Sequence, residues 1–266
     1  MRVVRVQGGL GNQLFCLAFA DSIARLVGGP VGLDLTSYGH DFYGRIFETK
    51  DLFARRGDFV FTPRRLLGSR PIRVISRFLP VPGIIREKKT PLDREGLKQL
   101  VARQGYFDGY WQNEDYIFEP EAFSHSVRAL VMSKSTPVPE ADLVIHFRTY
   151  KEERRADARG TPGRDYFRRA LEFLSVGGDP PRRALLLSDT PELARERIGD
   201  IGVELVVPDG GMWGDMALLM AARRLILTNS SFSWWGGFCN PHAQITYPER
   251  GECYHYPFPA ARFKII

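Results

Sequence analysis

The segment 143–247 decides the fold, because it repeats one pattern along its length. It opens with the apolar run LVIHFR (143–148) and continues with ALLLS (184–188), VELVV (203–207), LILT (225–228) and QITY (244–247). Helical patterns separate these runs at about 166–175, 191–198, 215–223 and 231–238. Short apolar strands that alternate with helices predict a parallel, doubly wound α/β sheet.

Functional residues are expected at one edge of this sheet. Ligands of doubly wound sheets bind beyond the carboxyl ends of the strands. The residues that directly follow the predicted strands are Arg148, Asp189, Pro208, Asp209, Asn229, Ser230 and Ser231. Thr190 precedes Pro191 and is expected to cap the helix 191–198.

The N-terminal part predicts a second and shorter α/β pattern. A strand is expected over 2–7, a glycine turn at GGLGNQ (8–13), a helix over about 12–27 and a strand over 31–35. The segment 38–103 is rich in proline and arginine, and its weak periodicity predicts no particular elements. KSTPVP (134–139) is typical of a linker. We therefore expect an N-terminal domain over 1–136, a C-terminal domain over 137–248 and a tail over 249–266.

The composition indicates an ordinary globular protein. Of the 266 residues, 44% are hydrophobic and 26% are charged, which excludes a disordered chain. The three cysteines (Cys16, Cys239 and Cys253) lack C-x-x-C spacing, which argues against a disulfide framework and a zinc site. Because a strand-like run begins at Arg2, we expect no signal peptide. A membrane span needs roughly 18 consecutive apolar residues, and charged residues interrupt every apolar stretch before it reaches that length. We expect a cytoplasmic protein.

Positive charge is concentrated in one segment. Between Arg64 and Lys89 there are eight basic residues and one acid, Glu87, while the whole chain carries only +6. Apolar residues alternate with these charges, which favours contact with an anionic membrane surface or a lipid-linked diphosphate acceptor. Nucleic acid is disfavoured, because Phe78 is the only aromatic residue there that could stack on a base. A solvated surface with ordinary arginines explains the segment equally well.

Two runs combine a turn with a helix start. The loop GGLGNQ places backbone N–H groups where an anion can bind, although Leu14 stands where a dinucleotide motif has its third glycine. A purely structural turn is the alternative. The run NSSFSWWGG (229–237) puts an amide and three hydroxyls at the mouth of a buried strand, a cradle suited to a diphosphate. Its alternative is a helix N-cap with aromatic packing.

The run HFR (146–148) adds positive charge at the same edge. Alternation places His146 and Arg148 on one face of the strand and Phe147 on the other. There Arg148 would neutralise a diphosphate leaving group, while a surface salt bridge is the alternative. The chain has no D-x-D pair and no Cys/His cluster with ligand spacing, so we expect no metal ion and no other cofactor.

Taken in order, these motifs resemble those of the bacterial α-1,2-fucosyltransferase family (glycosyltransferase family 11). Further matches are GYWQNE (109–114), LSD (187–189) and DMALLM (215–220), and 229–237 is the most specific. The resemblance implies a GT-B-like α/β protein, in which two Rossmann-like domains face each other across a cleft. The N-terminal domain would lie on the acceptor side. Its chemistry would be inverting transfer of L-fucose from GDP-fucose to a glycan hydroxyl, in α-1,2 linkage to galactose.

The resemblance also implies roles for individual residues. Arg148 would bind the donor diphosphate, Asp189 the guanine edge, and Asn12 the sugar. Ser230, Ser231 and Phe232 would line the phosphate pocket. The full set expected to bind the donor is Gly9, Gly11, Asn12, Gln13, His146, Arg148, Ser188, Asp189, Asp215, Asn229, Ser230, Ser231 and Phe232.

One segment departs from the family pattern. Members continue the H-x-R motif with Arg-Gly-Asp-Tyr, whereas this chain has Thr149, Tyr150, Lys151 and Glu152. Glu152 and Glu153 are the nearest carboxylates to act as general base for the acceptor hydroxyl, and solvated loop residues are the alternative. The change leaves two further hypotheses open: a donor with another nucleotide or deoxysugar, and a non-catalytic protein that binds a nucleotide sugar or glycan.

Overall fold

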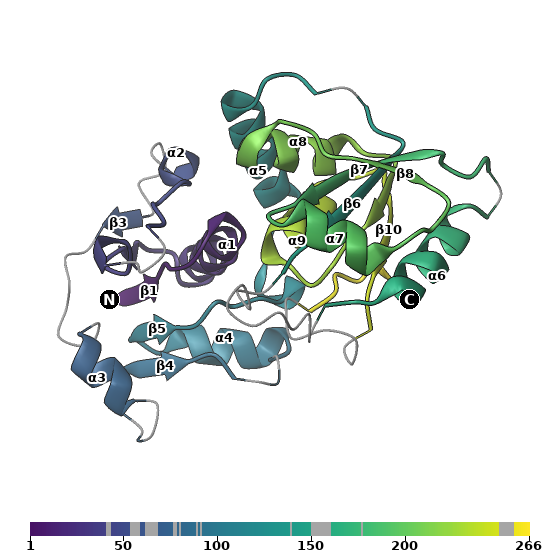
Figure 1. The fold of residues 1–266 in the computed structure, drawn as a ribbon. Coiled ribbons are helices and arrows are strands. Elements are labelled where there is room, and N and C mark those ends of the chain that lie inside the picture. Colours follow the sequence, from purple (N-terminus) through teal and green to yellow (C-terminus); the bar gives the residue numbers. More distant parts are fainter. Residues whose placement is uncertain are drawn as a thin grey trace. The chain divides into compact units, whose positions relative to one another are not determined.

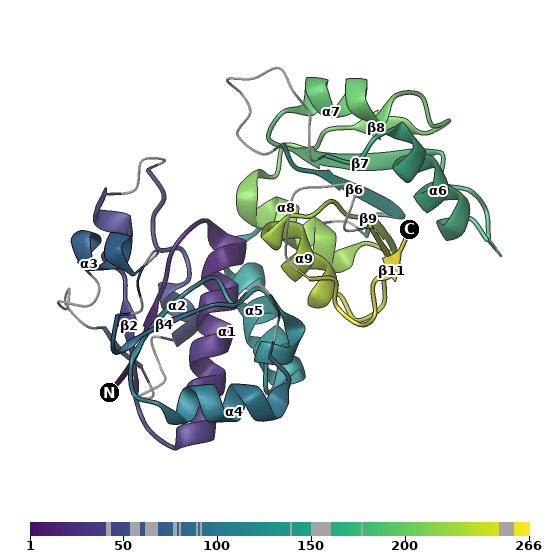
Figure 2. The same ribbon diagram turned by 90° about the horizontal axis from the view of Figure 1, so that it is seen from below.

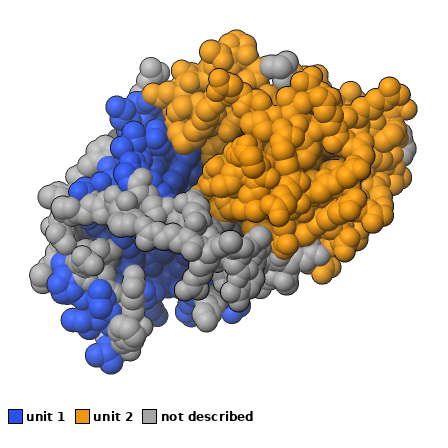
Figure 3. Space-filling model, viewed as in Figure 1, with its two compact units in different colours: residues 1–123 blue, residues 124–266 orange. Residues whose placement is uncertain are grey.

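The chain forms two compact units, Met1–Phe123 (unit 1) and Ser124–Ile266 (unit 2), coloured separately in Figure 3. The computed structural model describes residues 1–40, 44–53, 59–61, 69–76, 79, 81–88, 90, 92–138, 140–149, 161–176, 178–249 and 258–266. Each unit contains one parallel sheet with helices around it (Figure 1), so the prediction of two Rossmann-like α/β domains is confirmed. The predicted boundary after residue 136 falls beyond the end of helix α5 (Pro120–Lys134).

Unit 1 is built on a sheet of five parallel strands in the order β3-β2-β1-β5-β4. The strands are β1 (Arg2–Arg5), β2 (Val31–Asp34), β3 (Phe59–Phe61), β4 (Ile84–Arg86) and β5 (Tyr106–Asp108). The helices are α1 (Leu10–Val27), α2 (Lys50–Phe53), α3 (Arg70–Ile75) and α4 (Arg94–Ala102), with 3-10 turns at Tyr38–His40 and Glu114–Tyr116. The central strand β1 pairs on one side with β2 and on the other with β5, so the chain changes direction across the sheet between β1 and β5.

Among the elements of unit 1, helix α1 supplies the largest share of the buried apolar residues. Nearly all of its side chains are buried, because the helix packs against both the sheet and α4. Phe19 stacks on Trp111, with ring centroids 4.0 Å apart, and Phe107 and Tyr116 complete the aromatic cluster. Gly28, with φ +63°, ends the helix in the left-handed conformation that glycine adopts without strain.

Unit 2 has six parallel strands in the order β11-β10-β9-β6-β7-β8. They are β6 (Leu143–Phe147), β7 (Arg183–Ser188), β8 (Glu204–Val206), β9 (Arg224–Ile226), β10 (Gln244–Tyr247) and β11 (Lys264–Ile265). The helices are α5, α6 (Arg164–Leu174), α7 (Pro191–Ile198), α8 (Gly211–Ala221) and α9 (Ser231–Phe238). The first strand is central and the order reverses between β6 and β9, which is the arrangement of dinucleotide-binding sheets.

The two faces of β6 bury different partners, as the alternation predicts. Leu143, Ile145 and Phe147 belong to the core formed with α6 and α7, and Phe147 lies 5.9 Å from Phe167 between ring centroids. His146 lies on the other face, toward Phe232 of α9. Helices α8 and α9 pack against each other (Figure 2).

The predicted elements of unit 2 are largely confirmed, with differences in the bounds of some elements and in one side-chain cap. Helices α7 and α9 and strand β10 have the predicted bounds, while α8 begins and ends earlier than expected. Thr190 precedes α7 but makes no side-chain cap. The Thr190 hydroxyl lies 3.0 Å from the Thr149 hydroxyl instead, so it forms a hydrogen bond there and not with the first turn of α7.

The basic segment 64–89 is only partly described. Arg64, Arg65, Arg77 and Lys89 lie outside the described residues, so the predicted membrane contact stays a prediction. Within the described part of the chain, no helix combines the length and apolar character that crossing a membrane requires.

Candidate functional site

Two predicted charged residues meet at the carboxyl edge of the sheet in unit 2. Arg148 directly follows β6, and Asp189 directly follows the neighbouring strand β7. Arg148 Nη1 lies 2.8 Å from Asp189 Oδ2, and the two side chains are 35% and 31% exposed. The backbone N–H of Arg148 donates to Thr228 Oγ1 at 3.1 Å, which joins the end of β6 to the end of β9. Arg148 therefore lies at the point where the strand order reverses.

Helix α9 begins beside this point, and its serines have different roles. Ser230 is the N-cap, and its Oγ accepts a hydrogen bond from the N–H of Phe232 at 3.3 Å. Ser233 is buried, and its Oγ donates to the carbonyls of Thr228 and Ser230. Ser231 is only half-buried. The N-cap alternative thus explains Ser230, while the first turn of α9 has no acidic residue and keeps its positive end uncompensated.

His146 contributes a buried polar atom to the same place. The residue is 6% exposed, its ring centroid lies 5.8 Å from that of Phe232, and its Nδ1 has no hydrogen-bond partner among the described residues. Burial, aided by the charge of Arg148, lowers the pKa of His146 to about 3, so the imidazole is neutral near pH 7. A buried polar atom without a partner is costly, and it marks where a bound group can supply the missing hydrogen bond.

The remaining predicted residues of unit 2 are more scattered. Ser188 Oγ accepts from the N–H of Thr190 at 3.1 Å and so shapes the turn after β7. Asp215 is half-buried on α8, and burial raises its pKa to about 6. Asn229 is buried just before the cap of α9. Glu152 and Glu153, the predicted bases, lie outside the described residues.

The glycine loop belongs to unit 1 and is held from several sides. Gly9 is the N-cap of α1 and Gly11 is buried in its first turn. Gln13 is fully buried: its Nε2 donates to the carbonyls of Gly8 and Ile46, and its Oε1 accepts from Glu48 and Thr49. Because every hydrogen-bonding position of this amide is used, Gln13 fixes the loop, and the geometry leaves no amide atom for a donor. The role predicted for it has no support here.

Asn12 is connected to a second motif. Its Oδ1 accepts a hydrogen bond of 2.7 Å from Gln112 Nε2, so the loop GGLGNQ and the run GYWQNE lie together at the carboxyl edge of β1 and β5. Sequence reasoning did not identify this contact, nor the part played by Thr149, Thr190 and Thr228 around Arg148. A hydroxyl side chain at or directly after the end of a predicted strand was the available signal for Thr228 and Thr149.

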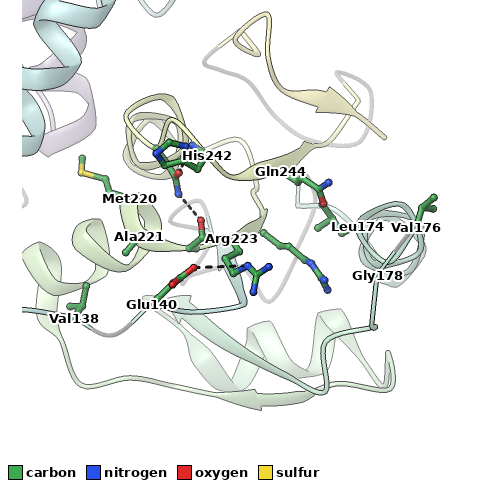
Figure 4. Close-up of a pocket in the computed structure, with 13 residues that line it drawn as sticks. Val138, Glu140, Leu174, Val176, Gly178, Met220, Ala221, Arg223, His242 and Gln244 are labelled. Atoms are coloured by element: carbon green, nitrogen blue, oxygen red, sulfur yellow. Dashed lines mark hydrogen bonds and ion pairs between the residues drawn. The ribbon is translucent and has the colours of Figure 1, made fainter.

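A cavity of about 830 Å³ opens at the opposite edge of the sheet in unit 2 (Figure 4). It is lined near the start of β9 by Arg224 and near the start of β10 by Gln244, and Arg223 pairs there with Glu140 at 3.9 Å. None of the predicted site residues lines it. Across the described residues, no group of three or more His, Cys, Asp or Glu side chains is placed to hold a metal ion.

Comparisons with known proteins give weak similarities. No family model and no curated protein matches the sequence. The similar solved structures include E. coli heptosyltransferase WaaC with ADP-2-deoxy-2-fluoro heptose (13% identity, TM-score 0.45, covering 100% of this chain and 93% of that one). A mutant of Arabidopsis thaliana FUT1 in complex with GDP has 14% identity and a TM-score of 0.47, covering 95% of this chain and 72% of that one. E. coli ADP-heptose lps heptosyltransferase II has 9% identity and a TM-score of 0.45, covering 100% and 90%. These matches establish no family for the chain.

Proposed function

We propose that this protein is an inverting glycosyltransferase that transfers L-fucose from GDP-fucose to a glycan hydroxyl, in α-1,2 linkage to galactose. One observation carries the proposal: Arg148, the start of α9 and the unpartnered Nδ1 of His146 lie together where the strand order of unit 2 reverses. In sheets of this order, nucleotide ligands bind at that point. The proposed donor and linkage come from the resemblance of the ordered motifs, from 8–13 to 229–237, to those of the α-1,2-fucosyltransferases.

The residues at this point suit a diphosphate. The guanidinium of Arg148 is partly exposed and can contact a phosphate oxygen while Asp189 holds it in place. The N-terminal N–H groups of α9 add partial positive charge. A neutral His146 protonated on Nδ1 would donate one more hydrogen bond. Asp189 is thus favoured as an orienting residue for Arg148, whereas its predicted contact with guanine has no supporting geometry.

The proposed reaction is a single displacement at the anomeric carbon. The acceptor oxygen forms its bond to that carbon from the face opposite the diphosphate, and the bond between the carbon and the diphosphate oxygen breaks. The acceptor proton passes to a base, for which Glu152 and Glu153 remain the candidates, and GDP leaves with the bonding electron pair. Arg148 and α9 would stabilise the charge that develops on the departing oxygen. No metal ion takes part in this proposal.

The remaining parts of the proposal concern arrangement and location. Unit 2 would hold the donor, with Gly9, Gly11 and Asn12 of unit 1 on the acceptor side, in a GT-B arrangement. The acceptor would be a glycan, and the basic segment 64–89 would allow it to be lipid-linked, with the protein on the cytoplasmic face of the membrane.

The decisive experiment removes the guanidinium and tests a panel of nucleotide sugars. Arg148→Ala is expected to lower turnover about a hundredfold, equivalent to about 3 kcal/mol, because a charge-assisted contact to the leaving group is lost. Circular dichroism should show an intact fold. Arg223→Ala removes an arginine from the opposite edge of the same sheet and serves as the control, with wild-type turnover.

Three outcomes would contradict parts of the proposal. Turnover of Arg148→Ala within threefold of wild type would remove Arg148 from the reaction. If the wild-type protein were active only with a nucleotide sugar other than GDP-fucose, the sugar or the nucleotide of the donor would have to be reassigned. Tight GDP binding in calorimetry without transfer to any glycan would indicate a non-catalytic binding protein, the hypothesis that the altered segment after Arg148 favours.

A further inference from the structure

A carboxylate from the basic segment anchors the loop that follows β5. Glu87 directly follows β4, and its two carboxylate oxygens accept hydrogen bonds from two backbone N–H groups of this loop. Oε2 accepts from Tyr110 at 2.7 Å, and Oε1 accepts from Gln112 at 3.1 Å. A carboxylate that binds two N–H groups in this bidentate way fixes the backbone between them in one conformation.

The backbone of the loop requires this anchor. Trp111, which lies between the two N–H groups, has φ +58°, a conformation that a bulky side chain adopts only when its surroundings impose it. A Cβ atom on Gly109 would lie 2.5 Å from Cβ of Glu87, so the glycine leaves the space that the Glu87 side chain fills. The sequence is thus adapted to this contact at both residue 109 and residue 87.

The strands beneath the loop hold Glu87 in position. Asp108, the last residue of β5, is 8% exposed and pairs with Arg5 at 2.9 Å and with Arg86 at 3.2 Å. The N–H of Glu87 donates to the carbonyl of Asp108 at 3.4 Å. These contacts join the ends of β1, β4 and β5, and Glu87 directly follows this joined edge.

The anchored loop orients polar groups at the edge of unit 1. Gln112 Nε2 donates to Asn12 Oδ1 at 2.7 Å, and Asn12 packs over Gly8, where a Cβ atom would come within 2.6 Å of Asn12 Nδ2. Tyr110, which lies two residues before Gln112 in the anchored loop, is 37% exposed. Paired neutral amides suit the hydroxyl groups of a neutral sugar, because each amide can both donate and accept hydrogen bonds.

We propose that Glu87 is a positioning residue for the sugar that accepts the transferred group. It acts through Gln112 and Asn12 and does not contact the substrate, because both of its oxygens are engaged with the backbone. The inference rests on the proposed transferase function and adds to it the residue that sets the geometry of the acceptor subsite. Loss of Glu87 releases the loop and misplaces Asn12 and Gln112, while the anion site of unit 2 is unaffected.

The test compares Glu87→Ala and Glu87→Gln with Glu95→Ala, which removes an exposed carboxylate of α4 that pairs with Lys98. In Glu87→Ala, kcat/KM for the acceptor is expected to fall about ten- to hundredfold, from the loss of hydrogen bonds to a charged group. The fall should be smaller in Glu87→Gln, which keeps one acceptor oxygen. The Kd for GDP, measured by calorimetry, should stay within twofold in every variant. Hydrogen exchange of the Tyr110 and Gln112 amides should accelerate in Glu87→Ala and remain unchanged in Glu95→Ala.

The outcomes separate the two proposals. An active wild type, together with a Glu87→Ala variant whose acceptor kcat/KM stays within twofold, would overturn the role of Glu87 and leave the transferase intact. A parallel loss of GDP affinity would also overturn it, because it would show a general structural defect. A wild-type protein that transfers nothing would overturn both proposals.

Discussion

Arg148 and Asp189 form an ion pair that contributes little to stability. Each side chain is about one-third exposed, and such pairs stabilise a fold by about 0–1 kcal/mol. The network of Asp108 with Arg5 and Arg86 differs, because Asp108 is 8% exposed and removing it would take away the buried carboxylate that both arginines contact. The contrast fits a role of the first pair in orienting Arg148 at the proposed ligand-binding edge, while the Asp108 network joins strands of the sheet in unit 1.

Asp215 predicts a pH dependence of stability. Burial raises its pKa from 3.8 in the unfolded chain to about 6 in the fold, so the folded state binds this proton more tightly. Stability from this group is present below about pH 4 and is lost as the pH rises through 6. Asp215→Asn should therefore stabilise the protein at pH 7.5 by about 1 kcal/mol, a value reduced for the partial exposure of the group. Urea unfolding at pH 4 and pH 7.5 measures this, and an equal difference at both pH values would contradict it.

Individual site residues differ in how far the sequence reveals them. Arg148 and Asp189 directly follow apolar strands and Ser230 lies shortly after one, so their position at the carboxyl edge could be predicted. The residues that they contact could not be predicted, because the Arg148–Asp189 ion pair depends on β7 lying next to β6. Glu87 gave no signal, because it is one acid within a basic segment and its function depends on backbone N–H groups more than twenty residues away.

Helix α9 places its N-terminus rigidly at the reversal point of unit 2. Trp234 and Trp235 are fully buried, and Trp234 stacks on Phe238 with ring centroids 4.6 Å apart. A Cβ atom on Gly236 would lie 2.4 Å from Cβ of Leu219, so α9 packs against α8 more closely than any larger residue would permit. Dense packing of this kind fixes the direction of the helix axis and hence of its N–H groups.

The cap of α9 gives a prediction at the scale of one element. Ser230→Ala removes the Oγ that accepts from the Phe232 N–H, and should lower the free energy of unfolding by about 1 kcal/mol. Because the first turn would fray, the affinity for GDP should fall several-fold. Ser175→Ala, which loses a bond to the Leu171 carbonyl at the end of α6, is the control and should keep the wild-type Kd. A wild-type Kd for Ser230→Ala, measured by calorimetry, would exclude the N-terminus of α9 from the donor site.

Elements with strong local signals were predictable, and the short strands of the segment 38–103 were not. Pro191 marks the start of α7, and Ser230 that of α9, so their bounds follow from the sequence. Strands β3 and β4 have three residues each, too few for a period of two to be recognised. They exist because β2 and β5 offer them parallel partners, which is a property of the folded sheet and not of the segment 38–103.

At the scale of the whole molecule, the chain contains two reversal points with different chemistry. In unit 1 the reversal lies between β1 and β5 and presents the amides of Asn12 and Gln112. In unit 2 it lies between β6 and β9 and presents Arg148 and the start of α9. The first suits a neutral polar group and the second an anion. This division supports a reaction between a neutral acceptor and a nucleoside-diphosphate donor.

The same division leads to a prediction about metal ions. In many sugar transferases a divalent cation bound by a D-x-D pair neutralises the departing diphosphate, and this sequence contains no such pair. Arg148 and the N-terminus of α9 provide positive charge and partial positive charge at the place where the proposed diphosphate would lie, so the leaving group can be stabilised without a cation. Transfer should persist in millimolar EDTA, and added magnesium or manganese should change the initial rate by no more than about twofold, because less than about 0.5 kcal/mol of the barrier would then depend on the ion. The measurement is GDP release at saturating donor and acceptor, with Arg148→Ala assayed in parallel. An activity that EDTA abolishes and manganese restores would show that a cation performs the role assigned here to Arg148. It would also count against the resemblance to the fucosyltransferases on which the donor was proposed.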